Sequence, residues 1–194
     1  MPAEYRIKSA PQTLSNTSGA AKALLEKVHK KTGFIPKIYE GMALSPATLS
    51  TYLHGYELFR DDSAFTPAEQ EVIFLTISRF NKCEYCMSGH SLVADKVSKV
   101  PADVTQAIRD GQPIPDKRLA ALSHFTQVML ETRGYLSDKE AETFLAAGFK
   151  ENHMFLVILA IALKTITNYS NHISHPEMES VFSGYTWKAS QGQF

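Results

Sequence analysis

The sequence predicts an all-α fold of about seven to nine helices in one domain spanning residues 1–194. Apolar residues recur three and four positions apart along most of the chain, the spacing that gathers them on one face of a helix. No run of alternating apolar and β-branched residues is long enough to indicate a strand. Proline and glycine residues separate the apolar segments, as expected at helix ends.

The N-terminal part is predicted to form an extended arm over residues 1–16 and then three helices. The first helix runs from about Ser18 to Lys31 and ends at Gly33, a residue type that suits a left-handed C-terminal cap. A short helix follows Pro36. The third helix begins at Pro46, and its apolar side, which could also contact a second subunit, carries Leu49, Tyr52, Leu53, Tyr56 and Phe59.

The central part contains the clearest helix start. Thr66 can cap the helix, Pro67 suits its first position, and Glu69 completes a capping box. This helix is apolar on most sides as far as Phe80, where polar residues break it. A further helix opens at a cysteine motif and runs to about Val97.

The C-terminal part is predicted to hold a short helix and a loop between residues 101 and 115, then helices over 116–132 and 137–147. The last helix, at about 151–172, is the most apolar in the chain. The tail over residues 174–194 has few packing signals, which are Phe182, Tyr185 and Trp187.

Composition argues against several classes of function. The chain has 20 basic and 20 acidic residues and no basic run, so neither nucleic acid nor an anionic membrane is an expected partner. The longest apolar stretch, residues 154–163, is too short to cross a bilayer. The polar N-terminus lacks the apolar region of a signal peptide, so we expect a cytoplasmic protein. No glycine-rich dinucleotide motif is present, and we expect no cofactor.

The chemistry is concentrated in the run from Cys83 to His90. It holds both cysteines of the chain, three positions apart at the start of a predicted helix, with His90 one turn after Cys86. Two such thiols can cycle between dithiol and disulfide, and a helix N-terminus favours the thiolate. Redox chemistry is the favoured interpretation. A zinc half-site, which would need two more ligands, and an inert pair are the alternatives.

Two further groups of polar residues interrupt apolar helices. Glu71 lies twelve residues before Cys83, and a buried carboxylate with a raised pKa could relay protons. The alternative interpretation is that Glu71 belongs to the solvated first turn after the Thr66 cap, where the helix dipole favours a carboxylate. Asn168 and His172, near the end of the last helix, could line a pocket or an oligomer contact, and helix capping is the simpler interpretation.

The segment from Pro67 to Lys96 resembles the core of the carboxymuconolactone decarboxylase-like family, in particular its alkylhydroperoxidase D-like branch. The signature of that family is a glutamate upstream of a C-x-x-C-x-x-x-H run. All four positions and their spacing are matched, by Glu71, Cys83, Cys86 and His90. The resemblance covers roughly residues 30–100 well and the last helix more loosely. It departs at Tyr85, where the best-studied branch has a histidine.

The resemblance implies a thiol-dependent peroxidase that reduces hydroperoxides. Cys86 would attack the peroxide and become a sulfenic acid, Cys83 would resolve it to a disulfide, and His90 with Glu71 would relay protons. Tyr85 is a poor base near neutral pH but could orient a water or the substrate. A lipoylated or thioredoxin-like dithiol would reset the pair. The family also implies a homo-oligomer, a trimer or hexamer.

Two alternative functions remain beside the peroxidase. The first is a thiol–disulfide oxidoreductase or redox sensor without significant peroxide turnover. The second is a carboxymuconolactone decarboxylase-like lyase, which is less favoured because those relatives generally lack the cysteine pair.

Overall fold

A computed structural model describes residues 5–189, and within that range the chain is helical with no strand. The predicted all-α fold is therefore confirmed. The arm over residues 5–16 contains no helix, and residues 1–4 of that prediction lie outside the described range. The helices are α1 Gly19–Thr32, α2 Lys37–Met42, α3 Pro46–Asp61, α4 Pro67–Phe80, α5 Glu84–Lys96, α6 Ala102–Asp110, α7 Lys117–Glu131, α8 Asp138–Ala146, α9 Glu151–Ser174 and the 3-10 helix η1 Ser180–Tyr185.

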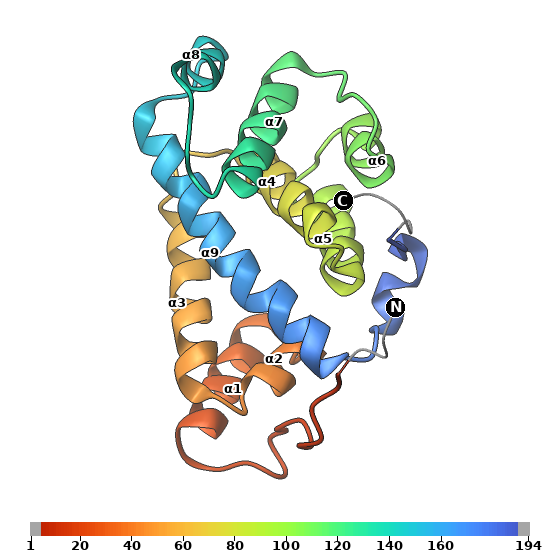
Figure 1. The fold of residues 1–194 in the computed structure, drawn as a ribbon. Coiled ribbons are helices and arrows are strands. Elements are labelled where there is room, and N and C mark those ends of the chain that lie inside the picture. Colours follow the sequence, from red (N-terminus) through yellow and green to blue (C-terminus); the bar gives the residue numbers. More distant parts are fainter. Residues whose placement is uncertain (1–4, 190–194) are drawn as a thin grey trace.

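Helix α4 is the centre of the core. The predicted capping box starts it: the Thr66 backbone N–H donates to the Glu69 carboxylate at 2.8 Å, and the Glu69 N–H donates to the Thr66 hydroxyl at 3.3 Å. Every residue from 69 to 78 is buried, because α5, α6, α7 and α9 all pack around this helix. In Figure 1, α4 lies between α7 and α5. An ionisable side chain in this stretch therefore has to find its partner inside the protein.

Helix α9 is the longest helix and crosses the molecule beside α3 (Figure 1). A Cβ atom on Gly55 of α3 would lie 2.8 Å from Leu163, so the glycine permits this close approach. The apolar side of α3 faces inward, and Leu49, Tyr52 and Phe59 are buried. Much of this side therefore packs inside the subunit, and its contact with a second subunit stays a prediction.

Helix α9 is long and apolar enough to span a membrane by length and composition alone. The core helix of a globular protein has the same signature. In this fold α9 packs against α2, α3, α4, α5 and α7, which is the environment of a core helix.

A tight turn connects α4 to α5 and places the cysteines. Lys82 adopts the left-handed conformation with φ of 54°, and Cys83 is the N-cap residue of α5. The Cys83 N–H donates to the Ser78 carbonyl at 2.9 Å, which holds the start of α5 against the end of α4. The sequence placed both cysteines at a helix start, and the structure confirms this.

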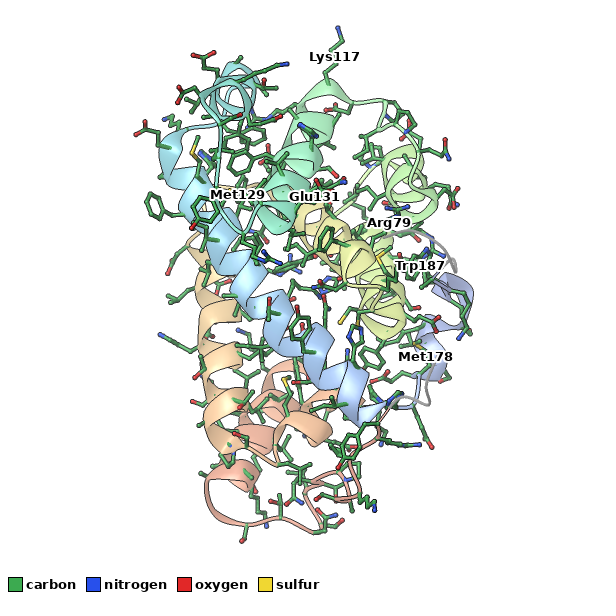
Figure 2. All side chains as sticks on the ribbon, viewed as in Figure 1. Arg79, Lys117, Met129, Glu131, Met178 and Trp187 are labelled. Carbon is green, nitrogen blue, oxygen red and sulfur yellow. The ribbon has the colours of Figure 1, made fainter. Side chains whose placement is uncertain are left out.

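The C-terminal tail packs more extensively than its few apolar signals suggested. Phe182 of η1 meets Tyr85 edge to face at 5.7 Å. The Trp187 indole N–H donates to the Arg109 carbonyl at 2.9 Å, and Figure 2 shows Trp187 and Met178 along the α5 side of the molecule. The tail therefore covers α5, the helix that carries the cysteines.

Candidate active site

The two cysteines lie in the core between α5 and α9. Both are free thiols, and Cys83 and Cys86 are 1% and 4% exposed. The side-chain amide of Asn171, on α9, donates to both sulfurs, at 3.4 Å to Cys83 and 3.2 Å to Cys86. One amide thus holds the thiol pair from the facing helix, and a hydrogen-bond donor stabilises sulfur best when it is anionic.

Glu71 joins the cysteine helix to α3. Its side chain is fully buried, so the alternative that it belongs to a solvated first turn is wrong. One carboxylate oxygen lies 2.8 Å from Nδ1 of His90, and the other pairs with the guanidinium of Arg60. Phe74 packs beneath this group, with its ring 5.0 Å from that of His90 and 4.8 Å from the Arg60 guanidinium carbon.

The charge state of Glu71 differs from the expectation. Burial alone would raise the pKa of Glu71, but its interactions with His90 and Arg60 outweigh burial and lower the pKa. The predicted proton carrier with a raised pKa is therefore replaced by a permanent carboxylate. Such a carboxylate orients the imidazole by accepting its Nδ1–H, which leaves Nε2 as the basic nitrogen.

The pKa of His90 is lowered in this environment, which favours the neutral imidazole near neutral pH. Burial lowers the pKa of His90, the positive charge of Lys164 lowers it further, and Glu71 opposes both effects only in part. A neutral His90 with Nδ1–H bound to Glu71 can accept a proton at Nε2, as a general base does.

The pKa values of the two thiols are shifted in opposite directions. Burial would raise the pKa of Cys86, but a hydrogen bond from Cys83, the positive charge of Lys164, the neighbouring His90 and the Asn168 amide lower it well below its usual value. The hydrogen bond with Cys86 and burial raise the pKa of Cys83 well above its usual value. Because a thiolate is the reactive form of cysteine, Cys86 is the better nucleophile of the pair.

Helix α9 contributes a buried polar stripe to the site. Lys164, Asn168 and Asn171 follow one another at the i, i+4 and i+7 positions of one helix face, and each is at most 5% exposed. The Asn168 carbonyl oxygen accepts from the Asn81 amide at 2.9 Å. Asn168 was predicted as a site residue, whereas sequence reasoning missed Lys164. Lys164 lies one helical turn before Asn168, and this spacing could have identified it as a residue of the same face.

Two predicted pocket residues have partners other than the sulfurs. His172 is on the exposed side of α9, stacked on Tyr169 with ring centroids 6.2 Å apart, and it is not part of the thiol cluster. Tyr85 is half-buried, and its hydroxyl donates to Glu179 of the tail at 2.6 Å. Burial and this carboxylate raise the pKa of Tyr85, so its hydroxyl stays protonated and connects α5 to the tail.

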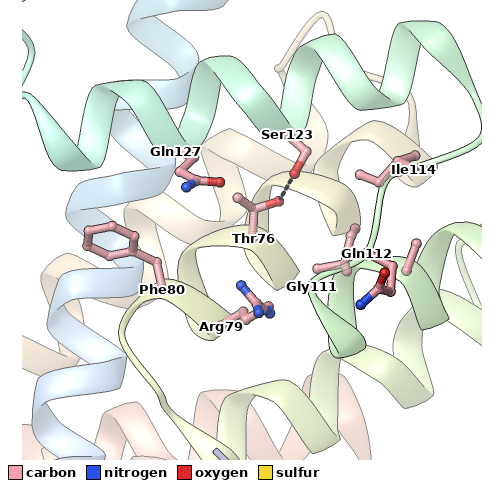
Figure 3. Close-up of a pocket in the computed structure, with 10 residues that line it drawn as sticks. Thr76, Arg79, Phe80, Gly111, Gln112, Ile114, Ser123 and Gln127 are labelled. Carbon is pink, nitrogen blue, oxygen red and sulfur yellow. Dashed lines mark hydrogen bonds between the residues drawn. The ribbon is translucent and has the colours of Figure 1, made fainter. Parts of the chain in front are cut away.

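A separate pocket lies on a different face of α4. Its volume is about 150 Å³, and Figure 3 shows Thr76 and Arg79 of α4 facing Gln112 and Ser123 across it. The Thr76 and Ser123 hydroxyls are hydrogen-bonded at 2.8 Å. The cysteines do not line this pocket. Across residues 5–189, no group of three or more His, Cys, Asp or Glu side chains is arranged to hold a metal ion.

Several solved structures share this fold, including the following three. An alkylhydroperoxidase AhpD core from Ralstonia eutropha, an uncharacterized peroxidase-related protein, aligns with a TM-score of 0.77 over 90% of this chain and 93% of its own, at 19% identity. A peroxidase-related protein from Silicibacter sp. aligns with a TM-score of 0.72 over 91% of each chain, at 18% identity. A variant of the debrominase Bmp8 in complex with 2,3,4-tribromopyrrole aligns with a TM-score of 0.72 over 94% of this chain and 97% of its own, at 14% identity. No curated protein matches the chain.

At these identities the solved structures establish the fold alone. The family model for carboxymuconolactone decarboxylases matches residues 46–142, half of the chain. The matched range runs from α3 into α8 and includes Arg60, Glu71, Cys83, Cys86 and His90. The chain belongs to the carboxymuconolactone decarboxylase family.

Proposed function

We propose that the protein is a thiol-dependent peroxidase that reduces hydroperoxides through Cys83 and Cys86. The observation that carries the proposal is the arrangement around Cys86. This buried thiol has a lowered pKa, receives a hydrogen bond from Asn171, and lies one helical turn before a neutral His90 held by Glu71. A stabilised thiolate beside an oriented base is what attack on an O–O bond requires.

The reaction balances with these residues alone and an external dithiol. The Cys86 thiolate attacks the terminal oxygen of the hydroperoxide, forms a sulfenic acid and releases an alkoxide, which takes up a proton to become an alcohol. The thiol of Cys83 then displaces hydroxide from the sulfenic sulfur, forming a Cys83–Cys86 disulfide and water. Protons enter and leave through Nε2 of His90, because Glu71 occupies the other ring nitrogen.

The reductant has to reach sulfurs that are almost completely buried. Burial favours a dithiol on a long flexible arm, such as a lipoyl group, over the rigid surface of a thioredoxin-like protein. Exchange with that dithiol restores both thiols and oxidises the arm to its own disulfide. The cytoplasm, which maintains such dithiols in reduced form, is the compartment we propose. A trimeric or hexameric assembly stays a prediction.

The test is a peroxide pulse on reduced wild-type protein and on two serine variants. Wild type should consume one equivalent of an organic hydroperoxide and lose two thiols. Cys86→Ser should consume none, and Cys83→Ser should accumulate a sulfenic acid that a dimedone probe labels on Cys86. Peroxide consumption by Cys86→Ser at the wild-type rate would contradict the assignment of the attacking cysteine.

A second candidate function is thiol–disulfide exchange or redox sensing without peroxide turnover. Tyr85 favours it, because this residue takes the place of a histidine in the best-studied branch and is bound to Glu179. Rapid exchange with a small disulfide together with slow oxidation by peroxide would support this function.

Because one structural neighbour is a debrominase, a bromopyrrole belongs in the same substrate panel. Halide release with loss of both thiols would point to reductive debromination.

A further inference from the structure

Lys164 is a buried cation in the middle of α9. Its side chain is 1% exposed, and its ammonium lies 5.5 Å from the centre of the Phe74 ring, the same ring against which His90 packs. Among residues 5–189 its ammonium has no carboxylate partner, since both oxygens of Glu71 are taken by Arg60 and His90. A buried, unmatched charge of this kind is costly, so a counter-charge is expected nearby.

The groups around Cys86 leave one candidate for that counter-charge. On α2 and α3, the rings of Tyr39 and Tyr52 pack against each other at 5.8 Å; burial raises the pKa of both, so they remain neutral. Arg60 and Glu71 neutralise each other. On α5 itself lie Cys83, which keeps its proton, and His90, while Tyr85 is also neutral. The remaining group that can become an anion is the sulfur of Cys86.

We propose that the ammonium of Lys164 is the counter-ion of a Cys86 thiolate, and that His90 is neutral in the resting protein. The proposal rests on the function proposed above, because it assigns the charge that prepares the attacking thiol. It differs from the usual cysteine–histidine ion pair, in which the imidazolium balances the thiolate. With Lys164 in that role, His90 is free to serve as the base throughout the cycle.

The electrostatic effects of Lys164 agree with this assignment. Its charge is among the influences that lower the pKa of Cys86 and, after burial, among those that lower the pKa of His90. A cation stabilises a neighbouring thiolate and destabilises a neighbouring imidazolium. An imidazolium–thiolate pair would instead raise the pKa of the histidine.

The experiment titrates both groups without any peroxide. In a Cys83→Ser background, so that one sulfur remains, thiolate absorbance in the ultraviolet reports Cys86 and NMR of the ring protons reports His90. Lys164→Met should raise both midpoints, that of Cys86 by about one to two pH units. Lys164→Arg, which keeps the charge, should leave the Cys86 midpoint low. The matched control is Lys117→Met, a lysine exposed at the far end of the molecule in Figure 2, which should change neither.

Comparison with Lys164→Arg separates a charge effect from loosened packing. Loosened packing would hydrate the site and disturb the hydrogen bonds to Cys86 in either variant, whereas the charge is lost in Lys164→Met alone. An unchanged or lowered Cys86 midpoint in Lys164→Met would overturn the proposal. If that variant does not fold, the His90 titration of the parent protein decides: a midpoint below the ordinary value near 6.5 is expected, and one above it would contradict the proposal. Because no peroxide is used, the outcome is independent of whether the protein is a peroxidase.

Discussion

Glu69 and Glu71 are two residues apart on α4, and both are buried and paired with an arginine, yet they have different tasks. Glu69 is the third residue of the helix, where its carboxylate accepts the Thr66 N–H and completes the cap. Its ion-pair partner, Arg118, is 43% exposed. Glu69 therefore depends on the helix end and on solvent for part of its stabilisation.

Glu71 lies beyond the free N–H groups of the first turn, so its charge is balanced entirely by side chains from other helices. Arg60 comes from α3 with 16% of its side chain exposed, and His90 comes from α5. A displacement of two residues along one helix thus changes a carboxylate from a helix cap into the anion that orients the base of the site. The position of a carboxylate relative to the helix end, and not burial alone, therefore decides its role.

The largest expected effect is on stability. Glu71→Ala should lower the free energy of unfolding by about 3–5 kcal/mol, because Arg60 loses its partner in a mostly buried position. Glu69→Ala should cost about 1–2 kcal/mol, since the cap is lost but Arg118 can turn to solvent. Urea unfolding followed by circular dichroism measures both values. Equal losses for the two variants would mean that the two pairs are energetically equivalent.

The second effect is on the proposed reaction. Glu71→Gln retains the shape of the side chain but removes the anion that holds His90, and peroxide reduction should slow by roughly a hundredfold in kcat/KM. Glu69→Gln is the matched control and should stay within about twofold of wild type. A similar loss in both variants would show that the difference in role does not extend to chemistry.

The smallest effect is a pH dependence of stability confined to the Glu71 cluster. The folded-state pKa of His90 is lowered, so the unfolded chain binds its proton more readily and stability falls as the pH drops below about 6.5. The folded-state pKa of Glu71 is also lowered, so its contribution is present above about pH 4.3 and is lost in stronger acid. Thermal midpoints measured against pH should therefore fall in two stages. His90→Gln should remove the upper stage and leave the lower one, whereas an unchanged upper stage would assign it to another group.

Local sequence determined much of the fold and the half of the site that α4 and α5 supply. Three helix ends depend only on neighbours within a few residues and could therefore be predicted from the sequence. They are the capping box at Thr66, the left-handed cap at Gly33 and the start of α5 at Cys83. The spacing of Cys86 and His90 likewise follows from the helical repeat.

Tertiary packing decided the other half of the site. Arg60 reaches Glu71 because aromatic side chains of α3 pack on Phe74 of α4. Lys164 is buried because α9 packs against α3 and α4, and no local pattern fixes which face of α9 turns inward. That choice buried Asn171 and left His172 exposed one residue later. The same packing gave Glu71 two cationic or hydrogen-bonding partners and so reversed the expected direction of its pKa. Sequence periodicity shows which residues share a face, whereas charge states depend on distances between helices that only the folded core sets.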